Sequence, residues 1–252
     1  MAPLHHCTMA PLHHCTMAPP HYGTTAPFSH STTAPRHYLI GGSVLAKKLL
    51  PEPSLFSSFR INQEKAMKTL LEPGKYYHVY NEARNGYPLF EDEDAFRFFL
   101  KLYQTHVCPV AETFAYCLLR DHLHLLIRIR DNATGSLYKP FALLFNGYTK
   151  GYNRHTGREG RVFRFKLKRI EIRNLPYFKE MIRYVNQNPW RHGVTEHPAN
   201  YRFSSFRATL TTGPSMIAKE KVLDYFGSHE SMTASLHTRV DETALHLFMM
   251  ER

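Results

Sequence analysis

The chain has 252 residues and a formal net charge of +11, with a pI of about 9.5. This excess of Lys and Arg predicts a polyanionic partner, either nucleic acid or an anionic membrane surface. No run of about 20 apolar residues is present, so no membrane span is expected, and the N-terminus lacks the features of a secretory signal. The four cysteines form no CxxC pair, which argues against a zinc knuckle or a disulfide framework and favours a reducing cytosol.

The first forty residues are a decaying eight-residue repeat. "MAPLHHCT" occurs twice and is followed by "MAPPHYGT", "TAPFSHST" and "TAPRHYLI". Proline in every copy forbids a continuous helix, and the apolar content is too low for a core. The His-His-Cys triplets offer metal-binding groups, but two identical copies followed by drift favour a disordered tail that arose from duplicated DNA. Residues 41–73 are then predicted to be a linker with one weak helical patch.

From residue 74 onward, the hydrophobic patterns predict strand, helix, two strands, helix, strand and helix. The segments are "KYYHVYN", "EDEDAFRFFLKLYQTH", "VAETFAYCLL", "HLHLLIRIR", "YKPFALLFNGYTKGYNR", "FRFKLKRIEI" and "NLPYFKEMIRYVNQNP". The "RD" dipeptide between the second and third strands suits a tight hairpin. The alternation of residues 163–172 predicts a strand with one wet, positive face, and the last helix must stop near Pro189. Because few parallel crossovers are implied, we predict an α+β fold with an antiparallel sheet.

Two histidines in the third predicted strand point to chemistry. His122 and His124 are two residues apart and therefore share a face, whereas Leu123 points into the core. Two neutral imidazoles on one face are able to hold one divalent metal ion. The alternative is a pair of unrelated core histidines satisfied by the backbone, which is favoured by about two to one for an isolated His-x-His.

The last predicted helix adds a second polar pair. Tyr184 and Asn188 are four residues apart and therefore lie on one helical face. They offer a phenolic oxygen and an amide oxygen that suits a hard metal ion. Considered alone, Tyr184 is better interpreted as a core aromatic and Asn188 as a helix-ending residue before Pro189.

The positive charge is concentrated between the third strand and the last helix. Nine Lys or Arg residues and two Glu residues between positions 150 and 173 give this segment +7 of the chain's +11. The candidate DNA-binding residues are Lys150, Arg154, Arg158, Arg161, Arg164, Lys166, Lys168, Arg169 and Arg173. Interleaved Tyr and Phe residues are typical of surfaces that stack exposed bases. A solvated basic surface is the alternative, but the concentration of charge favours nucleic-acid binding.

Five motifs, in order, resemble those of a known family. They are "YYHVYNEARNGYPLF", "AYCLLRDHLHLLIRI", "YTKGYNRHTGREGRVF", "YFKEMIRYVNQNPWRHGV" and "YRFSSF". The family is the single-tyrosine HUH (histidine, hydrophobic residue, histidine) transposases, and the REP-associated tyrosine transposases are the most similar branch. The resemblance covers residues 74–206, so we expect a transposase-like domain over 74–207. Because "LDYFGS" resembles a C-terminal extension of some relatives, residues 208–252 are expected to form a helical extension or tail. The N-terminal repeat has no counterpart.

The resemblance implies a ferredoxin-like HUH nuclease fold with helices on the faces of the sheet. It implies that His122, His124 and Asn188 bind Mg²⁺ or Mn²⁺ and that Tyr184 attacks a phosphodiester of single-stranded DNA near a hairpin. The products would be a 5′-phosphotyrosine link and a free 3′-hydroxyl, as in DNA transposition and recombination. It also implies a monomer or homodimer, associated with the bacterial nucleoid in the cytoplasm and not with a membrane.

Two departures from the family pattern keep other functions open. "RD" precedes His122 where relatives commonly have Pro-Asn, and the loop after Asn81 lacks the usual Arg-Gly. Neither departure removes a catalytic group. One alternative is a catalytically inactive protein of the same fold that binds DNA hairpins. Another is a rolling-circle replication initiator, although these usually carry further domains such as a helicase, for which this chain is too short.

Overall fold

The computed structural model describes residues 70–84, 86–211 and 213–241. The repeat of residues 1–40, which is predicted to be disordered, lies outside the described residues, as does most of the predicted linker. Within the described part, no helix combines the length and the apolar character needed to cross a lipid bilayer.

Four strands form one antiparallel sheet in the order β2-β3-β1-β4. The strands are β1 Tyr76–Glu82, β2 Ala111–Leu118, β3 His122–Ile129 and β4 Lys168–Ile172. Helix α2 (Glu93–His106) connects β1 to β2, and α3 (Lys139–Thr156) connects β3 to β4. This βαββαβ order with antiparallel pairing is the ferredoxin-like arrangement. The predicted α+β fold with an antiparallel sheet is therefore confirmed.

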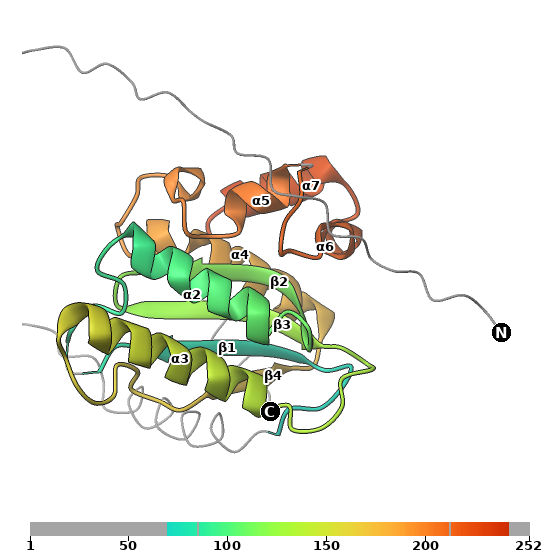
Figure 1. Cartoon of the computed structure of the whole chain (residues 1–252). Coiled ribbons are helices and arrows are strands. Elements are labelled where there is room, and N and C mark those ends of the chain that lie inside the picture. The colour runs from blue at the N-terminus through green and yellow to red at the C-terminus, as the bar shows by residue number, and fades with distance from the viewer. Residues whose placement is uncertain (1–69, 85, 212, 242–252) are drawn as a thin grey trace, which may run out of the picture. The chain divides into compact units, whose positions relative to one another are not determined.

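Helices α2 and α3 cover one face of the sheet (Figure 1). Phe99 of α2 and Tyr148 of α3 pack in one core with Leu123 and Leu125 of β3, and all four side chains are buried. Alternate residues of β3 supply this core because successive side chains on a strand point to opposite faces. The residues between them, including His122 and His124, therefore point to the other face.

The opposite face is covered by α4 (Leu175–Arg191) and by the C-terminal helices. These are η1 Pro198–Asn200, α5 Phe206–Leu210, α6 Lys219–Phe226 and α7 His229–His237. Phe178 and Ile182 of α4 share a buried cluster with Val222 of α6 and Leu236 of α7. Within the described part of residues 208–241, α6 and α7 therefore belong to the same core as α4.

Helix α4 ends at Arg191, two residues after Pro189, in agreement with the expected stop near this proline. A proline in the final turn removes only one backbone donor, and the His192 N–H still reaches the Asn188 carbonyl. The expected wet, positive strand face of residues 163–172 is wrong. The regular strand begins only at Lys168, and Lys168 and Arg169 are 2% and 7% exposed. The physical reason is that helices cover both faces of this sheet, so Lys168 and Arg169 are buried although they point to opposite faces.

Candidate functional site

Strand β3 presents both histidines of the HUH motif to the face covered by α4. The ring centroids of His122 and His124 lie 5.3 Å apart. His124 is buried, whereas the His122 side chain remains 16% exposed near the end of the strand. Of the two, only His122 therefore has a side chain that is partly exposed to solvent.

Helix α4 brings the tyrosine and the asparagine to the same place. Its first turn is capped by Asn174, whose side-chain oxygen accepts a hydrogen bond from the Tyr177 N–H. The Asn188 Oδ1 atom lies 3.1 Å from His122 Nε2, and the Tyr184 ring centroid lies 5.6 Å from that of His124. The structure therefore places the tyrosine–asparagine pair of α4 beside the histidine pair of β3. The chemical roles of the four residues stay predictions.

Two further residues of the site come from β1, which sequence reasoning treated only as a strand. The register places Tyr80 opposite His124. The Nε2 atom of His78 lies 2.9 Å from Nδ1 of His124, and the two rings stack with centroids 5.1 Å apart. Alternation along β1 predicts that His78 and Tyr80 share a face, but only the pairing register shows that this face is the one with the HUH histidines.

A buried cation, Lys168, lies next to Tyr80 on the side away from His124. Lys168 of β4 also lies opposite Tyr80, and its Nζ is 4.6 Å from the centre of the Tyr80 ring. Burial lowers the pKa of Lys168. Among the described residues, no carboxylate lies within ion-pair distance of Lys168, and Glu82, whose charge acts on it, is paired with Arg164 at 2.7 Å. A positive charge without a close counter-charge favours an anionic ligand at this face.

Burial also decides the charge of two histidines. It lowers the pKa of His78 to about 3, with a further contribution from the charge of Lys168. It lowers the pKa of His124 well below the ordinary value, helped by the neighbouring His78 and His122. Both imidazoles are therefore neutral at pH 7, which is the form that binds metal ions.

The contacts of His122 fit a hard divalent ion. Its Nδ1 lies 2.7 Å from Asp121 Oδ1, and if Nδ1–H donates there, the neutral ring presents a lone pair at Nε2 to the oxygen of Asn188. Two facing lone pairs 3.1 Å apart require a proton or a cation beside them. Two ligands at right angles on an ion with bonds of about 2.1 Å lie about 3.0 Å apart, which matches this spacing.

A metal ion at His122 and His124 would need the amide oxygen of Asn188 and at least one ligand from outside the protein. Within the described residues, no group of three or more His, Cys, Asp or Glu side chains is arranged to hold a metal ion. A metal ion held by His122, His124 and Asn188 would therefore keep coordination positions for water or substrate oxygens. Arg120 and Asp121 are the two residues before His122 that depart from the family pattern. Asp121 would orient the His122 ring as an outer-shell carboxylate, and Arg120 is exposed.

The nine predicted DNA-binding residues do not form one surface. Lys150, Arg154, Arg161, Arg164, Lys166 and Arg173 are exposed, Arg158 is half-buried, and Lys168 and Arg169 are buried. Arg164 pairs with Glu82, and Arg173 pairs with Glu171 at 2.9 Å. For these reasons the positive charge that this segment offers to a ligand is smaller than its net charge of +7.

Part of the basic segment lines a small pocket beside the β1–α2 loop. Its volume is about 240 Å³, and its lining includes Arg84, Tyr87, Arg158 and Arg161. The guanidinium carbon of Arg158 lies 4.2 Å from the centre of the Tyr87 ring, and Tyr87 is 54% exposed. An exposed aromatic ring among arginines is a combination that single-stranded nucleic acid binds.

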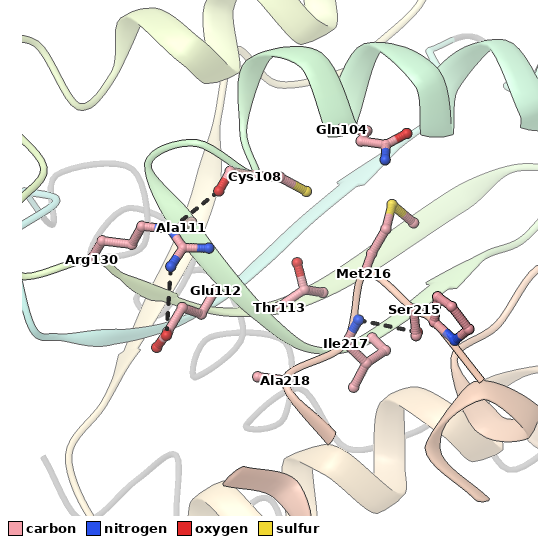
Figure 2. A pocket seen from close by; sticks show the side chains of 11 residues that line it. Gln104, Cys108, Ala111, Glu112, Thr113, Arg130, Ser215, Met216, Ile217 and Ala218 are labelled. Atoms are coloured by element: carbon pink, nitrogen blue, oxygen red, sulfur yellow. Dashed lines mark hydrogen bonds and ion pairs between the residues drawn. The ribbon is translucent and has the colours of Figure 1, made fainter. Parts of the chain in front are cut away.

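A larger pocket lies at the other edge of the sheet (Figure 2). It measures about 590 Å³ and is lined by α2, β2 and the segment 214–218. Figure 2 shows Arg130 between two partners, and its contacts are 3.2 Å to the Cys108 carbonyl and 3.6 Å to the Glu112 carboxylate. None of the residues predicted for catalysis, metal binding or DNA binding lines this pocket.

No protein-family model and no curated protein sequence matches the chain. Among solved structures, a REP-associated tyrosine transposase bound to a REP hairpin is 17% identical, with a TM-score of 0.46 over 57% of this chain and 83% of the other. A bacterial tRNA(His) guanylyltransferase (Thg1)-like protein in complex with GTP is 10% identical, with a TM-score of 0.37 over 55% and 74%. Another Thg1-like structure, in complex with ATP, is 11% identical, with a TM-score of 0.34 over 69% and 80%. At this distance, these likenesses do not assign the chain to a family.

Proposed function

We propose that this protein cuts and rejoins single-stranded DNA at hairpin-forming sites, in the manner of a transposase. The observation that carries the proposal is the convergence of Tyr184 and Asn188 of α4 on His122 and His124 of β3. A phenol, an amide oxygen and two imidazoles on one face are the groups that a metal-dependent phosphoryl transfer requires.

Tyr184 is the proposed nucleophile. Its phenol releases its proton to solvent as the oxygen forms a bond to phosphorus, the bond from phosphorus to the 3′-oxygen breaks, and the departing oxygen takes a proton from solvent to become a free 3′-hydroxyl. An ordinary phenol has a pKa of about 10 and attacks poorly at neutral pH, but the Arg191 guanidinium carbon, 4.8 Å from the Tyr184 ring centre, brings a positive charge close to it. When bound, Mg²⁺ or Mn²⁺ would polarise the phosphate oxygens and stabilise the charge that develops on them.

A covalent link suits rejoining better than hydrolysis. The phosphotyrosine is a phosphodiester and so keeps the energy of the broken DNA bond. A 3′-hydroxyl of the same or another strand then reverses the step without an external energy source. The proposed activity is therefore strand transfer, and a nuclease that activates water would not need Tyr184.

The proposed DNA contacts follow from the accessible part of the basic segment. Exposed Lys and Arg side chains neutralise phosphates, and the Tyr87–Arg158 pair offers a surface on which an unpaired base can stack. Lys168 would supply a positive charge to a phosphate held on the same sheet face as His124.

One observation favours a second function, that of a catalytically inactive nucleic-acid-binding protein. A doubly protonated His122 ring would donate to both Asp121 and Asn188, so these contacts can also be satisfied without a metal ion. In that case the same residues would only stabilise the end of β3 against α4.

The two functions are separated by a covalent-adduct assay. The full chain is incubated with Mn²⁺ and a pool of hairpin oligonucleotides that carry random single-stranded flanks and a 3′-end label. Because Tyr184 would retain the 5′-phosphate of the downstream fragment, wild type should carry the label on a denaturing gel, and EDTA should abolish it. Tyr184→Phe should form no adduct.

Tyr80→Phe is the matched control for this assay, because the Tyr80 ring centroid lies 6.3 Å from that of His124, only slightly farther than that of Tyr184. Tyr80→Phe should still form the adduct. An adduct that survives Tyr184→Phe at the wild-type level would refute the nucleophile, and the absence of any adduct together with retained DNA binding would favour the inactive protein.

A further inference from the structure

We infer that His78 is a positioning residue that holds His124 in the tautomer able to bind a metal ion. This inference rests on the proposed function and adds to it a residue that neither the HUH motif nor the tyrosine motif contains. His78 lies on β1, 46 residues before His124, and is 4% exposed.

The first step is the hydrogen bond between the two rings. His78 Nε2 and His124 Nδ1 are 2.9 Å apart, and a bond at this distance needs one hydrogen between the two nitrogens. An imidazole that binds a metal ion is neutral and carries one N–H, and so does an imidazole that accepts a hydrogen bond at one of its nitrogens. The hydrogen between them therefore belongs either to His124 or to His78. The two cases differ in whether His124 Nε2 has a lone pair or a proton.

The second step follows from counting the protons. If the hydrogen belongs to His124 Nδ1, then His124 Nε2 has a lone pair and is able to bind a metal ion. If it belongs to His78 Nε2, then the only proton of His124 sits on its own Nε2, and no lone pair remains for a metal ion. The metal-competent state of His124 thus requires His78 to accept at Nε2 and to carry its own proton at Nδ1.

The surroundings of His78 offer no competing partner for its second ring nitrogen. Its Nδ1 atom is buried and has no hydrogen-bond partner within the described part of the chain, so no other group determines the position of its proton. The ring is held from three sides, by stacking on Tyr80 at 4.9 Å, on His124 at 5.1 Å and by an edge contact with Tyr184 at 6.3 Å. Its orientation toward His124 is therefore fixed by packing.

Both metal-ligand histidines would then have an outer-shell acceptor, but of different kinds. Asp121, 2.7 Å from His122 Nδ1, would accept with a carboxylate, whereas His78, 2.9 Å from His124 Nδ1, would accept with a neutral imidazole. Removing such an outer-shell partner typically weakens metal binding by about 10- to 100-fold. A neutral acceptor is less effective than a carboxylate in raising the basicity of the ligand, which is consistent with a site for exchangeable Mg²⁺ or Mn²⁺.

The test uses the full chain in two measurements. In metal-free, ¹⁵N-labelled wild type, a nitrogen–nitrogen coupling across the hydrogen bond should connect His78 Nε2 with His124 Nδ1. Titration with Mn²⁺, followed by the electron paramagnetic resonance signal of the free ion, then compares variants. His78→Phe keeps a flat ring but cannot accept, and it should bind Mn²⁺ about 10- to 100-fold more weakly. His78→Gln places an amide oxygen near the former Nε2 and should restore binding to within about threefold of wild type.

His229→Phe is the matched control, since His229 is an exposed histidine on α7, and it should bind Mn²⁺ like wild type. Metal-free DNA binding and circular dichroism establish that every variant is folded. The inference fails if His78→Phe binds Mn²⁺ as tightly as wild type, or if the Phe and Gln variants lose the same affinity, which would indicate a packing role alone.

The same data separate this inference from the proposed function. If wild type shows the coupling but binds no Mn²⁺, the metal site of the proposed function is wrong and the positioning role falls with it. If wild type binds Mn²⁺ without the coupling, only the role of His78 is wrong.

Discussion

The imidazole of His122 and the amide oxygen of Asn188 meet at 3.1 Å although 66 residues separate them in the chain. The contact joins the end of β3 to the last turns of α4, and the weak bond from Asn188 Nδ2 to the Tyr184 carbonyl, at 3.5 Å, turns the amide oxygen toward the imidazole. It therefore couples the HUH motif to the helix that carries the proposed nucleophile.

Substitution of Asn188 distinguishes a cation from a proton between these two residues. If a metal ion binds there, Asn188→Asp should bind Mn²⁺ at least as tightly as wild type, because a carboxylate oxygen is a better ligand for a hard cation. Asn188→Leu should weaken Mn²⁺ binding by about tenfold or more, the loss of about 1.4 kcal/mol. Isothermal titration of the metal measures both. Equal affinity in wild type and Asn188→Leu would remove Asn188 from the site.

Lys168→Met is expected to stabilise the protein and to weaken its binding of single-stranded DNA. Replacing a buried charge that lacks a close counter-charge with an apolar side chain of similar length should raise the Tm by about 2–4 °C, the effect of about 1 kcal/mol in a chain of this size. Loss of the cation should lower DNA affinity at the same time. Lys166→Met, which removes an exposed charge two residues earlier, should lower the affinity for single-stranded DNA with little effect on Tm.

The stabilisation by Lys168→Met should depend on pH with a defined sign. Burial lowers the folded-state pKa of Lys168 below its ordinary value of 10.5, so between the two values the unfolded chain binds more protons. Wild-type stability contributed by this group therefore rises with pH across that window. The advantage of the Met variant should be complete at neutral pH and shrink as the pH approaches 10.5. Urea unfolding at several pH values tests this, and a constant advantage would contradict the assignment to charge burial.

The pocket beside the β1–α2 loop should contribute to binding of unpaired bases. Tyr87→Ala should lower affinity for single-stranded DNA by about 1–3 kcal/mol if one base stacks there, and Tyr87→Phe should retain it. Tyr138→Ala is the control, since Tyr138 is also exposed, at 40%, but lies at the start of α3. Fluorescence anisotropy measures all three, and similar losses at Tyr87 and Tyr138 would exclude a specific stacking site.

Exposed basic residues should control the salt dependence of DNA binding. Arg154→Gln combined with Lys166→Gln should weaken single-stranded DNA binding and flatten the slope of log K against log salt by about 0.7 for each lost phosphate contact. A control that removes the same charge from α2, Arg97→Gln with Lys101→Gln, should leave the slope close to that of wild type. If both double variants change the slope equally, the attraction is a general effect of net charge.

The sequence determined the geometry within each element. A strand repeats every two residues and a helix every 3.6, so the shared faces of His122 with His124 and of Tyr184 with Asn188 follow from spacing alone. The order of elements and the short β2–β3 connection likewise predicted an antiparallel α+β sheet, since these depend on local patterns of apolar residues and turns.

Only the tertiary structure decided which faces meet. The residue spacing within β1 does not predict that Tyr80 lies between His124 and Lys168. This arrangement depends on the pairing register of β1 with β3 and with β4, which are distant from it in the chain. For the same reason the hydrogen bond between His78 and His124 was missed. Burial was equally out of reach for Lys168 and Arg169, since a local pattern of alternating charge is the same whether a strand face is exposed to water or covered by a helix.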